Sequence, residues 1–443
     1  MSLDGTVSRA VTLGVVVVLC SCLLLLIAGD FLVGSLSAGN TNVSGEAALA
    51  AFITAPFSDD PNGINSDVLA GAARYIPNSR LYMRLAEFEM MQGGEFTARA
   101  EQHARRAIAL SPHNYRPHLL LAAILENKEE FGPAQQSVHA ALQLAPGNLQ
   151  AHWQLGGLLM QSGKLVESLP EYRTVASGDP EYFPLARDIV WEQSQHDAEA
   201  VIAITPGNVK ARVATAHFLL EKSRPVESAA VFRQAAAPEL LAERESAGYL
   251  SGLIAAGEID TARELWLWLF ERGGKTAESF RRRIENGGFE SDILLDWTQF
   301  DWSLNTNKFA QISIDPGIAH GGERSLRLDF LGRETTRLDQ EITQLMIVEP
   351  RVRYRVTYFV RTDGLRAPQG PRVVISPRAS AEWIAASEPA PAGTNDWQQQ
   401  TLEFIAPGPA VVLAIKQKPG FSYEDPTYGS VWYDDFEVTG LGR

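Results

Sequence analysis

Residues that could carry out chemistry occur throughout this sequence, but their spacing matches no catalytic motif. The chain has no G-x-S-x-G nucleophile elbow, no P-loop, no H-E-x-x-H zinc motif and no G-x-G-x-x-G dinucleotide loop. His113 and His118 flank an expected helix start and have no third metal ligand nearby. A glycosidase needs two carboxylates placed across a cleft, and nothing in the sequence indicates such a cleft. We therefore expect a protein that is not an enzyme.

Composition limits the partners and cofactors of the chain. Its 443 residues exceed what one core accommodates, so two or three domains are expected. The net charge of −14 argues against nucleic acid, whose binding requires a basic surface. The two cysteines, Cys20 and Cys22, lie in one apolar run, so the folded part has no disulfide and no cysteine-based metal site. No cofactor is required by this composition.

An apolar segment near the N-terminus predicts a membrane anchor. Residues 10–29 are twenty residues without a charge, and about 20 residues of helix span a bilayer. Arg9 precedes the run, which places the N-terminal tip in the cytoplasm. We expect a cytoplasmic tip and single transmembrane helix over 1–36 and a linker over 37–63. The bulk of the chain would then lie in the periplasm, held at a bacterial inner membrane.

Two alternatives for this segment stay open. Small residues at Ser35, Ser37 and Ala38 would permit cleavage of a signal peptide, although the apolar run exceeds the usual signal length of about 7–15 residues. A lipoprotein attached at Cys22 would begin with a very apolar mature segment. All three interpretations place most of the chain outside the cytoplasm.

Prolines recur with a regular period after the linker. Pro77, Pro112, Pro146 and Pro180 are separated by 35, 34 and 34 residues. A period of 34 with small residues at fixed helix positions resembles tetratricopeptide repeats, in which each proline ends a second helix. We expect an α-solenoid of about six helical hairpins over 64–283, because one hairpin cannot bury its apolar face alone.

The tetratricopeptide resemblance implies a concave groove that binds a peptide or a partner protein. Trp153 is the preferred groove residue, since it lies two positions before Leu155 and off the buried stripe. The alternative for Trp153 is a packing role inside the array.

From Asn286 onward the hydrophobic period changes from 3.6 to 2, and glycine and proline turns become frequent. Seven to nine short strands over 284–443 predict an antiparallel β-sandwich. The fold class is therefore multidomain α plus β, consisting of the transmembrane helix, the α-solenoid and the sandwich.

The last 155 or so residues resemble the jelly-roll carbohydrate-binding modules of the galactose-binding-like group. Five segments carry this resemblance in the expected order: 286–290 (NGGFE), 322–328 (GERSLRL), the strand around Tyr354, Asp396-Trp397, and 432–436 (WYDDF). An additional segment, Phe300-Asp301-Trp302, resembles a subgroup attached to tetratricopeptide arrays in bacterial exopolysaccharide and O-antigen clusters.

In such modules a calcium ion often holds the N-terminal segment against the last strand, and the residues here permit it. Trp432, Asp434, Phe436 and Val438 are every second residue of a strand and share one face. We therefore expect the Asp434 carboxylate on the inward face with the other three side chains. Glu290, in the opening segment, would supply the second carboxylate of a structural calcium site. The alternative is that Asp434 accepts backbone hydrogen bonds without a metal.

Sugar binding by such a module requires exposed aromatic rings beside polar groups. Four residues are candidates for these rings: Trp302, Trp383, Tyr423 and Tyr428. Three other tryptophans are expected in the sandwich core: Trp297, Trp397 and Trp432. A half-buried ring under a loop is the alternative for each of the four candidates.

The leading hypothesis is a membrane-anchored, non-enzymatic interaction protein. Its helical array would bind a protein partner and its sandwich would contact glycan, in cell-surface polysaccharide assembly or export. The alternative is a purely structural periplasmic scaffold without glycan binding. An enzyme acting on polysaccharide is the third hypothesis, and it would require an acid–base pair in a deep cleft.

Overall fold

The computed structural model describes residues 77–273, 283–378, 380 and 382–442. The predicted transmembrane anchor over 1–36 and the linker over 37–63 lie outside the described residues.

Within the described part of the chain, none of the helices is both long enough and apolar enough for a membrane crossing.

The chain divides into two compact units, Met1–Ile204 and Thr205–Arg443. This boundary lies within the region over which the repeats are predicted.

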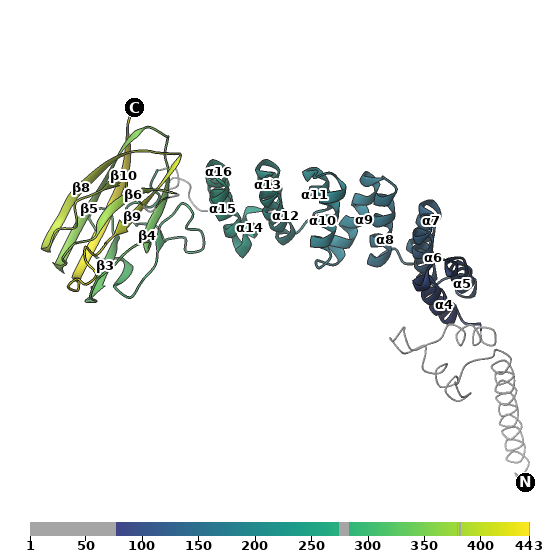
Figure 1. The fold of residues 1–443 in the computed structure, drawn as a ribbon. Helices are drawn as coiled ribbons and strands as arrows, with labels where there is room; N and C mark the ends of the chain where they lie inside the picture. The colour runs from purple at the N-terminus through teal and green to yellow at the C-terminus, as the bar shows by residue number, and fades with distance from the viewer. Residues whose placement is uncertain (1–76, 274–282, 379, 381, 443) are drawn as a thin grey trace, which may run out of the picture. The chain divides into compact units, whose positions relative to one another are not determined.

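The first unit is built from helical hairpins (Figure 1). Its described helices are α4 (Ser79–Gln92), α5 (Phe96–Leu110), α6 (Arg116–Asn127), α7 (Phe131–Leu144), α8 (Leu149–Gln161), α9 (Leu165–Gly178), α10 (Phe183–Gln193) and α11 (Ala198–Ile204). Helices α5, α7 and α9 each end two residues before one of the periodic prolines. The proline period therefore located the ends of the second helices correctly, because proline cannot continue a helix.

Local sequence explains where the first helices begin and how the hairpins close. The side chains of Asn78 and Asn148 accept hydrogen bonds from the backbone N–H groups of Arg80 and Ala151, which caps α4 and α8. Small side chains are fully buried where helices meet, as the repeat pattern requires: Ala100, Ala104, Ala107, Ala122, Ala134 and Ala141. Small side chains at these positions let neighbouring helix backbones approach closely.

The second unit contains five described helices followed by the β-sandwich (Figure 1). The helices are α12 (Val209–Glu221), α13 (Pro225–Phe232), α14 (Ala237–Ala242), α15 (Arg244–Ala256) and α16 (Ile259–Arg272). Helices α12 with α13 and α15 with α16 form contacting pairs, and the short α14 lies between these pairs in the sequence. With the four pairs of the first unit, the described residues contain six helical pairs, as predicted.

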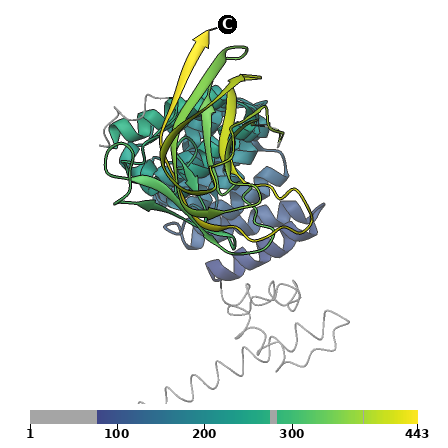
Figure 2. The same cartoon turned by 90° about the vertical axis from the view of Figure 1, so that its left-hand side faces the viewer.

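The sandwich consists of two five-stranded antiparallel sheets, which Figures 1 and 2 show from two directions. Sheet A has the order β1-β4-β9-β6-β7 and sheet B the order β2-β3-β10-β5-β8. The strands are β1 (Ser303–Leu304), β2 (Ala310–Asp315), β3 (Ser325–Leu331), β4 (Ile342–Ile347), β5 (Arg353–Arg366), β6 (Arg372–Pro377), β7 (Ala385–Ala386), β8 (Gly393–Ile405), β9 (Ala410–Lys416) and β10 (Tyr428–Gly442). Alternate residues of both sheets form one continuous core between them.

The orientation of β10 corrects one prediction. Val431 and Tyr433 belong to the core, so the side chains of Trp432 and Asp434 point to the outer face of sheet B. The pairing with β5 shifts between Asp434 and Glu437, and this irregularity returns Phe436 to the core. The expectation that Asp434 shares an inward face with Phe436 was wrong, because the irregularity interrupts the alternation of side chains.

Helix α16 packs against the segment that leads into the sandwich. The Trp266 ring is fully buried, and its Nε1 donates a hydrogen bond to the carbonyl oxygen of Trp297 at 3.2 Å. Its centroid lies 5.9 Å from the Phe300 ring in an edge-on arrangement. Phe300, the first residue of the Phe300-Asp301-Trp302 segment, thus contacts the helix. The third, Trp302, joins the sandwich core.

Candidate binding sites

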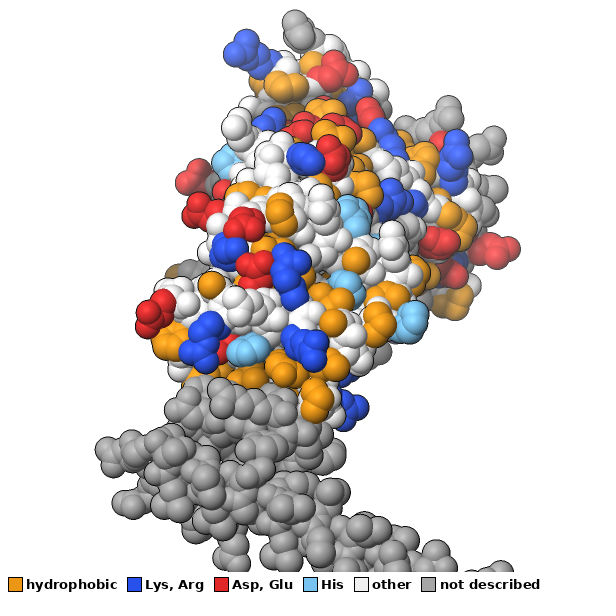
Figure 3. All heavy atoms as spheres, turned by 90° about the vertical axis from the view of Figure 1, so that its right-hand side faces the viewer, with side chains coloured by type: hydrophobic (Ala, Val, Ile, Leu, Met, Phe, Trp, Pro, Cys, Tyr) orange, Lys and Arg blue, Asp and Glu red, His pale blue; other side chains and the backbone are white. Residues whose placement is uncertain are grey.

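A groove of about 930 Å³ runs along the first helices of the hairpins in the first unit. Most of its lining residues come from α4, α6, α8 and α10, and Tyr172 of α9 also lines it. Its lining is mostly aromatic, aliphatic and amide: Met83, Glu87, Met90, Tyr115, Arg116, Leu119, Leu120, Ala123, Glu126, Gln150, Trp153, Gln154, Gly157, Met160, Gln161, Tyr172, Ile189 and Gln193. On the face shown in Figure 3, charges of both signs are interspersed with apolar side chains.

The repeat period explains the shape of this groove. Leu119 and Trp153 are 34 residues apart and provide large side chains, whereas Ala123 and Gly157 provide small ones with the same spacing. A Cβ atom added to Gly157 would meet nothing within 4 Å, so the groove is open at this position. Trp153 is the one groove position predicted from the sequence, although the same period could have identified the other lining positions.

Trp153 both lines the groove and packs within the array. Its ring is half-buried and meets Tyr172 edge-on, with centroids 5.4 Å apart, and lies 5.6 Å from Tyr182. The predicted groove position and its packing alternative therefore coexist in one side chain. Participation of Trp153 in binding stays a prediction.

Polar side chains connect neighbouring hairpins along the groove. The Gln154 amide donates to the Leu119 carbonyl oxygen at 3.3 Å, and the Gln161 amide donates to Glu126 at 2.8 Å. Amide groups beside apolar rings can bind both the backbone and the side chains of an extended peptide. The groove is therefore chemically suited to polypeptide.

The carboxylate of Asp434 is occupied by backbone donors. Its Oδ2 accepts hydrogen bonds from the N–H groups of His320 and Gly321 at 2.7 and 3.2 Å, and Oδ1 accepts one from Asp435 at 2.7 Å. Burial raises the pKa of Asp434 to about 6, against the lowering effect of these bonds. Asp434 thus anchors the turn that contains His320.

Glu290 has a similar role in the same region. Its Oε1 accepts hydrogen bonds from the N–H groups of Glu323 and Arg324, both at 2.9 Å. Among the described residues, no three histidine, cysteine or acidic side chains are grouped so that they could hold a metal ion. Backbone N–H groups bond the carboxylates of Glu290 and Asp434, as in the alternative without a metal, and calcium binding at these residues stays a prediction.

Trp302 is not the exposed sugar-binding ring that was predicted. Its side chain is 0% exposed, and its Nε1 donates to the carbonyl oxygen of Asn286 at 3.1 Å. Its ring lies 5.1 Å from each of the rings of Phe289 and Phe436. The ring fills the sandwich core, so this prediction was wrong.

The two candidate tyrosines flank the turn after β3. Tyr423 is 60% exposed, and its hydroxyl donates a hydrogen bond to Glu334 at 3.2 Å, which raises the pKa of Tyr423. Tyr428 is 50% exposed and lies over Gly332, where an added Cβ atom would meet the ring at 2.3 Å. Both rings are accessible, as the sugar-binding prediction requires.

Trp383 lies on the other sheet, in the connection between β6 and β7. Its ring is half-buried, and the Lys418 ammonium lies 4.6 Å from the ring centroid. Its buried Nε1 has no hydrogen-bond partner among the described residues. Trp383 therefore combines an aromatic face, an adjacent cation and an unused donor.

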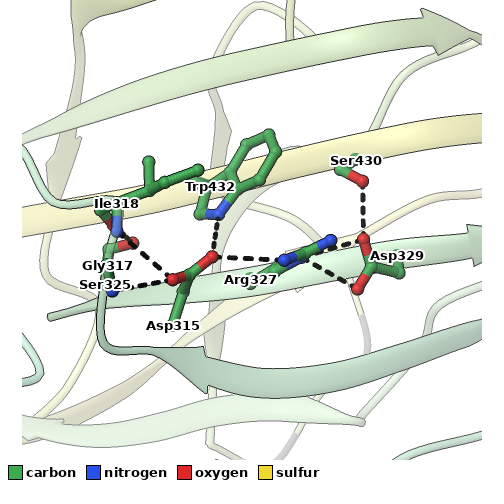
Figure 4. A network of polar contacts seen from close by, with 8 residues as sticks. All are labelled: Asp315, Gly317, Ile318, Ser325, Arg327, Asp329, Ser430 and Trp432. Atoms are coloured by element: carbon green, nitrogen blue, oxygen red, sulfur yellow. Dashed lines mark hydrogen bonds and ion pairs between the residues drawn. The ribbon is translucent and has the colours of Figure 1, made fainter.

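The outer face of sheet B carries a polar network that sequence analysis did not anticipate (Figure 4). Arg327 on β3 forms ion pairs with Asp315 and Asp329, and its guanidinium lies 5.2 Å from the Trp432 ring centroid. Trp432 Nε1 donates to Asp315 at 2.9 Å, and Ser430 donates to Asp329 at 2.5 Å. Trp432 is buried, but beneath Arg327 rather than in the core as predicted.

This network lowers the pKa of Asp315. Burial opposes ionisation, but the hydrogen bonds from Trp432, Gly317 and Ile318 and the charge of Arg327 outweigh it. The described hydrogen bonds and ion pairs engage the charged groups within the network, so we assign it a structural role.

Two other predicted core tryptophans also lie elsewhere. Trp297 is buried against Phe270 of α16, with ring centroids 5.8 Å apart. Trp397 is half-buried, and its ring lies 5.8 Å from that of His320, which stacks on Phe359. Neither belongs to the core between the sheets.

Known structures are similar to parts of this chain at low sequence identity. One described as "Crystal structure of MamA protein" is 15% identical over 40% of this chain and 91% of that chain, with a TM-score of 0.31. One described as "CBM4 structure and function" is 17% identical over 36% of this chain and 99% of that chain, with a TM-score of 0.26. The CBM22-1 xylan-binding domain from Paenibacillus barcinonensis Xyn10C is 14% identical over 35% of this chain and 93% of that chain, with a TM-score of 0.25.

The chain matches no protein-family model, and no curated protein matches its sequence.

Proposed function

We propose that this chain is a non-enzymatic interaction protein whose helical array binds a protein partner and whose β-sandwich contacts glycan. The observation that carries the first part is the groove of about 930 Å³ along α4, α6, α8 and α10. A concave surface with apolar rings and a few well-placed polar groups is typical of ligand sites. Trp153 and Tyr115 would contact apolar side chains of the partner, and the glutamines would bind its backbone.

Filling the groove tests the first part. Gly157→Tyr adds a ring where an added Cβ atom has open space, so we expect the helix to tolerate it. Gly132→Tyr is the matched control, because Gly132 is exposed on α7, is equally unobstructed and is not among the lining residues. Peptides selected from a random 12-residue display library against the full-length chain would serve as probes.

We expect Gly157→Tyr to weaken binding of the selected peptides by tenfold or more, about 1.4 kcal/mol, with no change in Gly132→Tyr. The measurement is fluorescence anisotropy of labelled peptide. Peptides that bind both variants as tightly as the natural chain would place the interaction outside the groove and contradict the proposal.

The sandwich is the proposed glycan-binding part. The exposed rings of Tyr423 and Tyr428 and the half-buried ring of Trp383 support this assignment. Glycan binding can be measured on an array of bacterial polysaccharides with the full-length chain, Trp383→Ala and Tyr423→Ala. Loss of binding in either variant supports glycan contact.

A scaffold without glycan binding is the second candidate, and the burial of Trp302 in the core favours it by removing one predicted ring. This candidate predicts that no polysaccharide on the array binds, while groove-dependent peptide binding remains. An enzyme acting on polysaccharide would instead consume polymer during incubation, and product analysis of the same samples would detect it.

The proposed location is the periplasmic side of a bacterial inner membrane, in cell-surface polysaccharide assembly or export. The uncharged run over residues 10–29 supports a single anchoring helix. Deletion of residues 10–29 should move the chain from the carbonate-resistant membrane fraction to the soluble fraction. A chain that is released by carbonate even with residues 10–29 present would contradict the anchor.

A further inference from the structure

The outer face of sheet A carries several cations, and one of them lies beside Trp383. Val373 and Ile375 of β6 and Ile415 of β9 belong to the core, so their neighbours Arg372 and Lys416 point away from it. Lys418 follows β9, and its ammonium lies 4.6 Å from the Trp383 ring centroid. We call Arg372, Lys416, Lys418, Ser376 and Trp383 the cationic face.

The charges of the cationic face repel one another. Arg372 and Lys416 are directly paired across β6 and β9, and like charges in such positions destabilise a sheet. Burial lowers the pKa of Lys416, and the charge of Lys418 lowers it further. Lys416 is only 8% exposed, so its ammonium is held at a desolvation cost.

Among the described residues, the cations of this face lack a carboxylate in direct contact. None of Arg372, Lys416 and Lys418 has a carboxylate within 4.0 Å in that part of the chain. Asp339 and Glu341 act on Lys416 from farther away. Both are already engaged, Asp339 with Arg337 and Glu341 with the amide of Asn307.

The same face leaves buried polar atoms without partners. Ser376 is 5% exposed, and its side chain points outward because Ile375 points into the core. Its hydroxyl oxygen and the Nε1 of Trp383 have no hydrogen-bond partner among the described residues. Unsatisfied buried polar atoms are costly, so their presence indicates a ligand that supplies the missing bonds.

We propose that the cationic face binds a polysaccharide that carries carboxylate groups. The Trp383 ring would stack on the apolar face of a sugar, and Ser376 and Trp383 Nε1 would bind hydroxyl oxygens. Arg372 and Lys418 would bind the carboxylates through charge-assisted hydrogen bonds. The chain has a net charge of −14 and would repel an anionic polymer elsewhere, so a local cationic surface is required for such a ligand.

This inference rests on the proposed glycan binding and adds the class of glycan. The test compares polygalacturonate with its fully methyl-esterified form, which has the same backbone without charge, and with neutral xylan. The proteins are the full-length chain, Trp383→Ala, Lys418→Gln and Arg372→Gln. Lys308→Gln removes one exposed positive charge from the loop before β2 and is the matched control.

The natural chain should bind polygalacturonate at least tenfold more tightly than its methyl ester in affinity electrophoresis. This preference should shrink when the salt concentration rises from 0.05 to 0.5 M, because salt screens exposed charges. Lys418→Gln and Arg372→Gln should each weaken binding of the acidic polymer at least threefold and leave the neutral forms unaffected. Lys308→Gln should leave binding of the acidic and the neutral polymers unchanged, and Trp383→Ala should weaken binding of both kinds of polymer.

Equal binding of the charged and esterified polymers, still lost in Trp383→Ala, would overturn the carboxylate preference and leave glycan binding intact. No binding to acidic or neutral polymer, by a chain with an unchanged unfolding transition, would contradict the proposed glycan binding itself. If Lys308→Gln weakened binding of the acidic polymer as much as Lys418→Gln does, the carboxylate preference would come from the overall charge of the chain. That result would overturn the proposed site.

Discussion

Asp434 shows how one buried carboxylate makes stability depend on pH. It is fully buried, and burial raises its pKa to about 6, whereas an exposed aspartate has a pKa near 3.8. The folded chain therefore holds this proton more tightly than the unfolded chain does. The stability that protonation provides is fully present below pH 3.8 and is lost as the pH rises through about 6.

Asp434→Asn removes this titration. The free energy of unfolding of the variant, minus that of the natural chain, should rise between pH 4 and pH 7 by up to about 3 kcal/mol. Urea unfolding at both pH values, followed by tryptophan fluorescence, measures this difference. A difference that is the same at both pH values would show that Asp434 does not titrate in this range.

Trp302→Ala should destabilise the sandwich rather than reduce sugar contact directly. The ring is 0% exposed between Phe289 and Phe436, so its removal leaves a cavity that costs about 3–5 kcal/mol. Tyr423→Ala, at a 60% exposed position, should stay within about 0.5 kcal/mol of the natural chain. Chemical denaturation of both variants checks this contrast, and a mild effect of Trp302→Ala would contradict the core position.

At the scale of elements, two adjacent glycines of α8 have opposite roles. A Cβ atom on Gly156 would lie 3.2 Å from the Tyr172 ring, whereas one on Gly157 would meet nothing within 4 Å. Gly156→Ala should therefore destabilise the array by about 1–3 kcal/mol through overpacking. Gly157→Ala should stabilise it by about 0.5–1 kcal/mol, because alanine has the higher helix propensity.

Thermal unfolding followed by circular dichroism at 222 nm distinguishes the two glycine variants. If the unfolding temperatures of both variants shifted by similar amounts in the same direction, Tyr172 of α9 would not set the spacing between α8 and α9.

Helix α16 and the entry to the sandwich form one packed element. Trp266→Ala removes the ring that contacts Phe300 and the donor to the Trp297 carbonyl oxygen. We expect amide hydrogen exchange in residues 292–302 to accelerate at least tenfold. This acceleration corresponds to a loss of about 1.4 kcal/mol of local stability. Trp268→Ala is the control, because it removes an indole from a partly exposed position of the same helix. Equal exchange in both variants would contradict the specific contact.

At the scale of the whole molecule, the division at Ile204 and Thr205 predicts two cooperative units. Residues 77–204 and residues 205–443 should each fold when expressed separately, because each unit has its own buried core. The calorimetric unfolding profile of residues 77–443 should then match the sum of the two separate profiles. An unfolded 205–443 segment would show that the sandwich depends on the first unit.

Some of this organisation followed from local patterns. The prolines located the ends of α5, α7 and α9 because proline excludes the next helical turn. The change of period at Asn286 located the sandwich because strand faces alternate. Tyr423 and Tyr428 are exposed, Trp383 is half-buried and Trp302 lies in the core, since aromatic type does not specify which side of a layer a ring occupies.

The sequence by itself determined the α plus β class and the repeat period, because helix, strand and turn preferences act over a few neighbouring residues. Only the tertiary structure decided where the functional groups meet. The pairing irregularity in β10 reversed the expected face of Asp434 relative to Phe436. The pairing of β6 with β9 brought Arg372 beside Lys416 across 44 residues of sequence. Such contacts depend on strand register, which long-range packing sets and no local pattern records.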